Sequence, residues 1–328
     1  MLGSLRDLDA EQQVALLFLM LFGLLVLVSA SAIVLSLRET AEPTLAQLER
    51  HDRFVRDLRA AWIGATLFWL AWISGPVGST LLFGVLSFLA LREFITLTHT
   101  RRADHRSLIL AFFVILPAQY LLAGGRWFDL FSVFVPVYAF VALPVASALA
   151  GDPKRFLERN AKIQWGVMVC VYGLSHAPAL LLLDVGPTPG RGAFLVFFLV
   201  SVVAVGFIAQ EVMAARLRAR PIARQISRSF SYRAWALGVA AGMLAGVLLY
   251  WITPFEPEQA LALGAIAAAT GSLGELVMRA LKRDAGVRTW GQAASVTGAV
   301  GLLDRVAPLA FAAPVFFHAV RWYFKAPV

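Results

Sequence analysis

The sequence predicts an all-α protein that crosses a membrane several times, and its composition provides the first observations. Hydrophobic residues make up 59% of the 328 residues, charged residues make up 15%, and the mean hydropathy is +0.74. Soluble domains are about 45–50% apolar and about 25% charged, so a soluble fold is excluded. Disorder is excluded as well, because disordered chains have low hydrophobicity. The single cysteine, Cys170, leaves no partner for an intramolecular disulfide.

Ten apolar segments are each expected to form a spanning helix, which needs about 20 apolar residues. They lie near residues 14–37, 60–74, 79–98, 107–122, 127–150, 165–183, 192–215, 234–252, 260–281 and 306–320. The second, fourth and last are short, so eight or nine spans are the alternative counts. We expect one membrane domain over residues 1–328, with N-terminal spans in 1–215 and a C-terminal part in 216–328.

The basic residues predict the orientation of these spans. Of the 29 Lys and Arg residues, 22 lie in five segments, at 38–59, 99–106, 151–164, 216–233 and 282–305. These segments all face one side if the N-terminus is outside, and basic loops face the cytoplasm. The net charge of +9 follows from these loops, so it does not indicate nucleic acid as a partner.

Three acidic residues fall inside or at the ends of apolar segments, where ionisable groups are costly and often mark function. They are Glu93, Glu211 and Glu275. Glu275 and Arg279 are four residues apart and therefore share one helix face. This pair is either an internal ion pair, which lets the helix carry both charges, or part of a functional site. Glu211 is expected at the membrane interface.

Metal and phosphate motifs of the common types are missing from the sequence. His176 and His318 are expected to be hydrogen-bonded core residues rather than metal ligands. No cluster of His, Cys, Asp and Glu has the spacing of a zinc site, and no Walker or G-x-G-x-x-G loop is present.

The stretch 271–305 combines acidic, basic and glycine residues at the predicted membrane surface. Glu275 leads into Lys282 and Arg283, then a glycine-rich loop follows, and Asp304-Arg305 precedes the last span. Carboxylate, basic side chains and accessible backbone at headgroup level suit a ligand that carries phosphate. The alternative is an ordinary basic loop with glycine turns.

These residues resemble the C-terminal signature of the bacterial CDP-diacylglycerol synthases, also called phosphatidate cytidylyltransferases. That signature has Gly-Asp, Ser-x-x-Lys-Arg, a Gly-x-Lys-Asp-x-Gly loop and Asp-Arg-x-Asp. The matching segments here are Gly274-Glu275, Arg279-x-x-Lys282-Arg283, 286–291 and Asp304-Arg305-Val306-Ala307. Short segments along most of the chain also resemble a shorter bacterial branch of the family. The resemblance implies joining of CTP and phosphatidate to give CDP-diacylglycerol and pyrophosphate, with Mg²⁺ held by carboxylates.

The departures from this signature fall on the residues that would perform the chemistry. In the C-terminal part, Glu275 replaces the Asp of Gly-Asp, and the family's Lys, Asp, His and second Asp appear as Arg288, Thr289, Ala299 and Ala307. Upstream, the family's Ser-Asn-Asp appears as Val205-Gly206-Phe207. The Lys and Glu of its Ser-Pro-x-Lys-Thr-x-Glu-Gly loop appear as Phe230 and Arg233. Loss of acids and gain of arginines turn a metal–nucleotide site into a surface for anions.

The first hypothesis is a family member that has lost catalysis, located in the bacterial cytoplasmic (inner) membrane. It would bind anionic phospholipid, either phosphatidate or CDP-diacylglycerol, and regulate an active paralogue or form a homodimer. The expected phosphate-binding residues are Ser227, Arg224, Arg228, Arg233, Lys282, Arg283, Arg288 and Arg305.

Two other hypotheses remain open. The second is an active, divergent cytidylyltransferase that uses CTP. Its catalytic residues would be Glu275, Asp304 and Lys282, and Glu275 and Asp304 would hold a single Mg²⁺ weakly. No cofactor is expected if catalysis is lost. The third is a lipid or proton-coupled transporter that uses Glu93, Glu211 and Glu275 as a relay.

Overall fold

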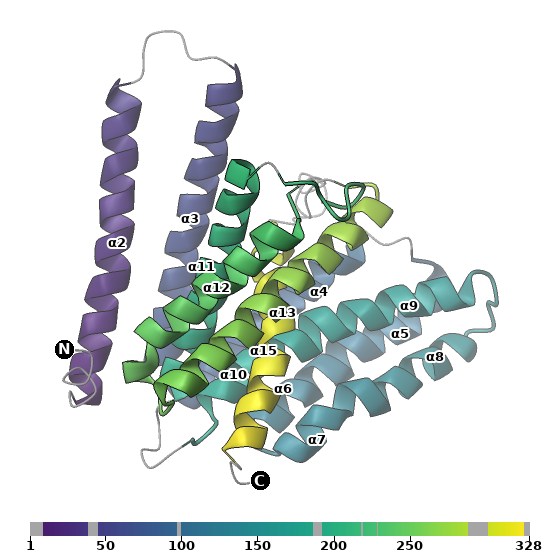
Figure 1. The fold of residues 1–328 in the computed structure, drawn as a ribbon. Helices are drawn as coiled ribbons and strands as arrows, with labels where there is room; N and C mark the ends of the chain where they lie inside the picture. Colours follow the sequence, from purple (N-terminus) through teal and green to yellow (C-terminus); the bar gives the residue numbers. More distant parts are fainter. Residues whose placement is uncertain are drawn as a thin grey trace. The chain divides into compact units, whose positions relative to one another are not determined.

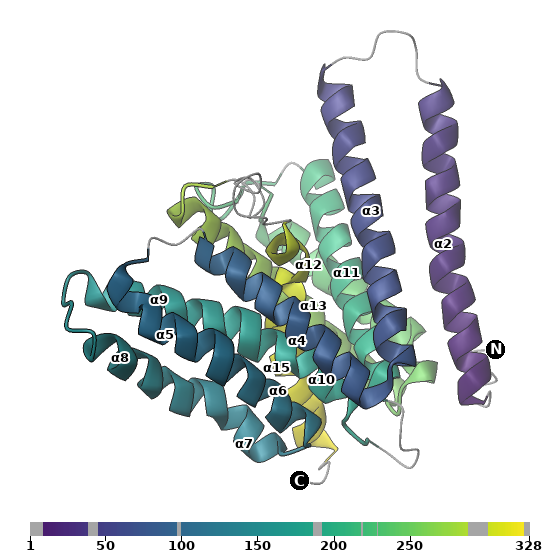
Figure 2. The same ribbon diagram turned by 180° about the vertical axis from the view of Figure 1, so that it is seen from behind.

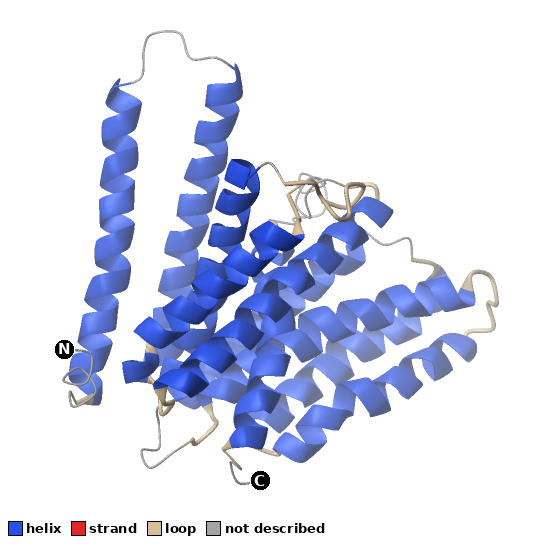
Figure 3. Ribbon diagram, in the orientation of Figure 1, coloured by secondary structure: helices blue, strands red, loops and turns tan. Residues whose placement is uncertain are grey.

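A computed structural model describes residues 9–38, 45–96, 100–185, 192–217, 219–227, 229–287 and 301–324. The described residues are helical with short connections and contain no strand (Figure 3). The chain divides into two compact units, Met1–Gly75 and Pro76–Val328.

The first unit is a pair of antiparallel helices that lie side by side (Figures 1 and 2). They are α2 (Ala10–Arg38) and α3 (Leu45–Ile73). Aromatic side chains join them, with ring centroids 5.1 Å apart for Phe18 and Trp69 and 5.6 Å apart for Phe22 and Trp62. The indole N–H of Trp62 also donates to the hydroxyl of Ser29 at 3.1 Å. Helix α3 begins well before the predicted span at 60–74, so much of the predicted 38–59 loop is helical.

The second unit begins with α4 (Gly75–Thr96) and three long helical segments, each interrupted by a π-helical turn. Such turns insert an extra residue into the helical ladder and bend the helix. The first segment, after the short 3₁₀ turn η1 (Arg102–Asp104), is α5 (His105–Leu110), η2 (Ala111–Ile115) and α6 (Leu116–Gly124). The second is α7 (Phe128–Val133), η3 (Phe134–Ala139) and α8 (Phe140–Ala148), and the third is α9 (Phe156–Gly166), η4 (Val167–Gly173) and α10 (Leu174–Leu181).

Four further helices complete this unit: α11 (Gly192–Leu217), α12 (Tyr232–Leu248), α13 (Pro257–Asp284) and α15 (Leu302–Tyr323), with the 3₁₀ turn η5 (Tyr250–Ile252) between α12 and α13. Helices α11, α12 and α13 lie side by side (Figure 1). Glycines allow this close approach, because a Cβ atom on Gly242 would lie 2.4 Å from the Cβ of Ala268. Small residues at helix contacts are the usual means by which membrane helices pack.

All ten predicted apolar segments fall on helices of the structure. Seven helices in the described part of the chain are long and apolar enough to cross a membrane, and two shorter apolar helices lie at 61–73 and Tyr232–Leu248. The segment 165–183 lies on α9, η4 and α10, which are not among the seven. The membrane-helical character is therefore confirmed, whereas the number of spans and their orientation stay predictions.

Side-chain contacts bring four of the five basic segments to one end of the second unit. Arg159 bonds to Asp104 and to Asp152, both at 2.9 Å, which joins the α4–α5 and α8–α9 connections. The Glu93 carboxylate at the end of α4 accepts the backbone N–H of Leu302 at the start of α15. Contacts of α13 with the α11–α12 connection and with α15, described below, add the other two segments. We call this the basic end.

Candidate functional site

The guanidinium group of Arg279 is the centre of a polar cluster at the basic end. On α13 itself, Arg279 Nε donates to Glu275 Oε1 at 3.0 Å. From α11, Glu211 Oε1 accepts a bond from Arg279 Nη2 at 2.9 Å. In the α11–α12 connection, the hydroxyls of Ser227 and Ser229 accept bonds from Nη1 at 3.0 Å and 2.9 Å. These five residues form the Arg279 cluster.

Local sequence explains how the cluster assembles. Glu275 and Arg279 are one helical turn apart, so the ion pair allowed by their spacing is present. Glu211 lies near the end of α11, and the chain then turns back in a connection closed by a bond from the Ile222 N–H to the Phe230 carbonyl, 3.0 Å long. Beneath the guanidinium, the ring centroid of Phe207 lies 5.9 Å from Arg279 Cζ, within the range of a cation–π contact.

A second ion pair lies at the start of α15, where Lys282 Nζ and Asp304 Oδ1 are 2.5 Å apart. The Glu93 carboxylate, which is 2% exposed, accepts the backbone N–H groups of Leu302 and Leu303 at 3.1 Å and 3.2 Å. These N–H groups have no partner within the first turn of a helix, and a carboxylate there is favourable. Glu93 therefore holds the turn of α15 that carries Asp304.

Glu275 is the most buried acid of the Arg279 cluster, with 7% of its surface exposed. Its Oε1 atom bonds to Arg279, while its Oε2 atom has no hydrogen-bond partner among the described residues. Lys282 and Asp304 both act on this carboxylate electrostatically, so the Arg279 cluster and the Lys282–Asp304 pair adjoin. Oxygen Oε2 is thus a buried acceptor of the cluster that the described residues leave without a hydrogen bond.

The donor set does not fit a two-metal site. Such a site needs several oxygen ligands around two closely spaced ions. Here Glu275 and Asp304 each bond to a basic side chain of the same chain. Within the described part of the chain, no group of three or more His, Cys, Asp or Glu residues is arranged to hold a metal ion. The acids of the site are therefore paired with basic side chains of the same protein.

The structure places the other predicted phosphate-binding residues around this site or outside the described part. Arg224, Arg233 and Arg283 are exposed, as is Arg305. Arg228 and Arg288 lie outside the described residues. Sequence reasoning missed the central role of Arg279 and its bond to Glu211, which was expected only at the membrane interface. The signal available was the Glu275–Arg279 spacing, but no sequence pattern links residues 211 and 279.

The two histidines inside the helices lie in an aromatic core, as predicted. His176 is fully buried, and its Nδ1 donates to the carbonyl of Tyr172 at 2.7 Å. The rings of Phe131 and Phe317 lie against it, with centroids 4.6 Å and 5.2 Å away. His318 Nε2 lies 3.3 Å from the Tyr172 hydroxyl. The contacts of both rings are therefore those of hydrogen-bonded residues packed among aromatic side chains.

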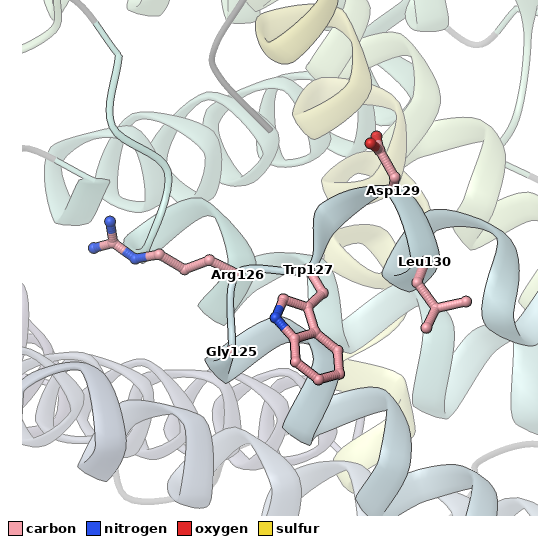
Figure 4. A pocket seen from close by; sticks show the side chains of 5 residues that line it. All are labelled: Gly125, Arg126, Trp127, Asp129 and Leu130. Carbon is pink, nitrogen blue, oxygen red and sulfur yellow. The ribbon is translucent and has the colours of Figure 1, made fainter.

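A surface pocket of about 470 Å³ lies at the turn between α6 and α7 (Figure 4). It is lined by Gly125, Arg126, Trp127, Asp129 and Leu130. Its charged residues already have partners: Arg126 bonds to Asp184 at 2.8 Å, and Asp129 bonds to Arg321 at 2.5 Å. The charged groups of the pocket are therefore paired within the chain, and the Arg279 cluster is the stronger candidate.

Comparisons with known proteins agree with the resemblance of the C-terminal motifs. The profile of the cytidylyltransferase family matches residues 55–323, which include both ion pairs of the candidate site. The chain is also 36% identical over 265 residues to the uncharacterized protein YnbB of Escherichia coli (strain K12), and the match covers 80% of this chain and 85% of that protein. The chain therefore belongs to the cytidylyltransferase family.

Proposed function

We propose that this membrane protein is a catalytically impaired member of its family that binds anionic phospholipid at its basic end. The observation that carries the proposal is the state of the two signature acids. Glu275 bonds to Arg279 and Asp304 bonds to Lys282, so each signature acid is paired with a basic side chain of the same protein, which competes with a metal–nucleotide complex. Transfer of a nucleotidyl group depends on positioned charge, so this pairing impairs it.

Exposed arginines supply the binding surface for the headgroup. The side chains of Arg216, Arg220, Arg224, Arg233 and Arg283 are exposed and, within the part of the chain that the structure describes, none of them is in an ion pair. Basic residues near a membrane surface attract anionic lipid by about 1 kcal/mol each. Five of them around one end of the bundle favour a lipid with a charged phosphate, such as phosphatidate or CDP-diacylglycerol.

The setting follows from the family and the basic loops. We place the protein in the bacterial inner membrane with its N-terminus outside, so that the basic end faces the cytoplasm. There it would meet newly made phosphatidate. A homodimer or a complex with an active paralogue is the assembly in which lipid binding would regulate synthesis.

The test compares two double variants that remove the same charge. Arg224→Gln/Arg283→Gln changes the proposed surface, and Arg102→Gln/Lys154→Gln changes exposed residues of the other loops at the same end. Phosphatidate binding to the purified protein in detergent is measured by native mass spectrometry, with phosphatidylcholine of the same chain length as the neutral comparison. Removing two basic residues should weaken phosphatidate binding by about 2 kcal/mol, so the dissociation constant of the first variant should rise roughly thirtyfold.

The control variant should bind phosphatidate within about threefold of the unmodified protein, because it lies outside the proposed surface. Equal weakening by both variants would mean that only net charge matters. Equal affinity of the unmodified protein for phosphatidate and phosphatidylcholine would reject anionic lipid as the ligand.

One observation favours a second candidate, an active and divergent cytidylyltransferase. Oxygen Oε2 of Glu275 is buried and has no hydrogen-bond partner among the described residues, so it could serve one Mg²⁺ together with Asp304. This candidate requires CTP binding that depends on Mg²⁺. Isothermal titration of the purified protein with CTP is carried out with and without Mg²⁺. It separates the two candidates, because the impaired protein should show no Mg²⁺-dependent heat of binding.

A further inference from the structure

The oxygen atoms that surround the Arg279 guanidinium are of the types expected around a divalent cation. Two carboxylates and two hydroxyls, from three separate segments of the chain, point their oxygens at one guanidinium group. Oxygen donors of these types are what Mg²⁺ and Mn²⁺ prefer. We infer that the Arg279 side chain is a built-in cation that occupies the place of a divalent metal ion between Glu211 and Glu275.

The geometry of the guanidinium group supports this role. Arg279 is only 23% exposed, and four of its five N–H groups are directed at the oxygens of Glu211, Glu275, Ser227 and Ser229. With so few donors left, Arg279 is poorly placed to bind a phosphate from solution. A cation that is saturated by its own chain acts as a fixed counter-ion rather than as an anion receptor.

The two residues in contact at this point both differ in charge from the residues of the family signature. Arg279 stands where the family signature has Ser, and Phe207 stands where it has an Asp. The guanidinium lies over the Phe207 ring, with Cζ 5.9 Å from the centroid. An acid with a divalent cation carries a net charge of +1, and Phe207 with Arg279 carries the same charge. The pair therefore keeps the local charge while removing the need for a metal.

This exchange explains how Glu211 and Glu275 can remain close at the membrane surface without a metal ion. Two carboxylates that approach one another repel unless a cation lies between them. Arg279 supplies that cation permanently. The role of Arg279 rests on the proposed loss of catalysis, but it is tested by metal binding, so it can fail while lipid binding holds, and the reverse.

The experiment measures Mn²⁺ binding by electron paramagnetic resonance on the purified full-length protein in detergent. In the unmodified protein Glu275 should not serve as a Mn²⁺ ligand. Glu275→Gln should therefore leave Mn²⁺ binding unchanged. Arg279→Ser removes the built-in cation and restores the residue type of the signature. It should tighten Mn²⁺ binding by about tenfold or more, because a positive charge next to both carboxylates is lost.

The tighter Mn²⁺ binding of Arg279→Ser must come from the freed carboxylates if Arg279 is a built-in cation. The double variants Arg279→Ser/Glu211→Gln and Arg279→Ser/Glu275→Gln should therefore lose it. The matched control is Arg155→Ser, which breaks another Arg–Glu pair, with Arg155 Nε and Glu158 Oε2 2.6 Å apart, and leaves a single exposed acid that Lys162 still contacts at 2.8 Å. This control should show no gain, because one carboxylate does not make a metal site.

Two results would overturn the inference. The first is a folded Arg279→Ser variant, judged by its elution as a single species, that binds Mn²⁺ no better than the unmodified protein. The second is Mn²⁺ binding by the unmodified protein that Glu275→Gln abolishes. The second result needs no change at Arg279, so it decides the question even if Arg279→Ser fails to fold.

Discussion

The strongest energetic consequence of the site concerns the buried Glu275 carboxylate once Arg279 is removed. Arg279→Ala deletes a guanidinium that bonds to two carboxylates and two hydroxyls. Hydrogen bonds to charged groups contribute about 1.5–3 kcal/mol each, and removing one partner of a buried ion pair costs about 3–5 kcal/mol. The Glu211 side chain is 36% exposed, so its share is small. We expect Arg279→Ala to lower the free energy of unfolding by about 3–5 kcal/mol.

A second change identifies the cause of that loss. Glu275→Gln in the Arg279→Ala background removes the uncompensated charge, so the double variant should be more stable than Arg279→Ala by about 1–2 kcal/mol. Equilibrium unfolding in mixed micelles, titrated with a denaturing detergent, gives the four free energies of the cycle. If the two changes add to within about 0.5 kcal/mol, the residues are not coupled and the ion-pair account of the cluster is wrong.

Three further predictions follow from other contacts of the second unit. Glu93→Gln removes the charged cap of α15 and should lower the free energy of unfolding by about 1 kcal/mol in the same assay, and no loss would contradict the capping role. Gly173→Ala places a Cβ atom 2.4 Å from the Ala310 carbonyl oxygen and should cost about 1–3 kcal/mol, whereas Gly84→Ala, whose nearest atoms lie at 3.7 Å, should cost about nothing. The Lys154 backbone N–H and the Arg101 and Arg159 side chains lower the pKa of Asp152, so its stabilising effect is present above the unfolded pKa and is lost as the pH falls through the folded one. Thermal unfolding of Asp152→Asn should therefore differ from that of the unmodified protein at pH 6, and the difference should shrink below about pH 4.

The helices could be predicted from the sequence because each is an apolar run bounded by basic, glycine or proline residues. Their details could not. The π-helical turns η2, η3 and η4 leave the apolar pattern unchanged, so hydropathy alone does not reveal them. The spacing of Leu45, Leu48 and Phe54 in the 38–59 loop indicates a short amphipathic helix, but nothing in the sequence shows that it continues into the span at 60–74 as one helix.

The candidate site was predictable only where its contacts are local. The Glu275–Arg279 bond follows from spacing on one helix. The bond between Arg279 and Glu211 joins residues that are 68 positions apart, and the bond between Glu93 and the start of α15 spans 209 positions. No spacing rule reaches that far. The pattern of apolar residues in the sequence places these acids near the ends of helices. Their partners, however, depend on how the helices pack.

We propose that this family member no longer performs the transfer that its signature implies. The most direct test is incorporation of radiolabelled CTP into lipid by the purified protein, with phosphatidate and Mg²⁺ or Mn²⁺ in micelles. A family member with an intact signature serves as the positive control. We predict incorporation at the level of the protein-free background, because Glu275 and Asp304 are held by Arg279 and Lys282. Incorporation well above background that Glu275→Ala abolishes would contradict the claim.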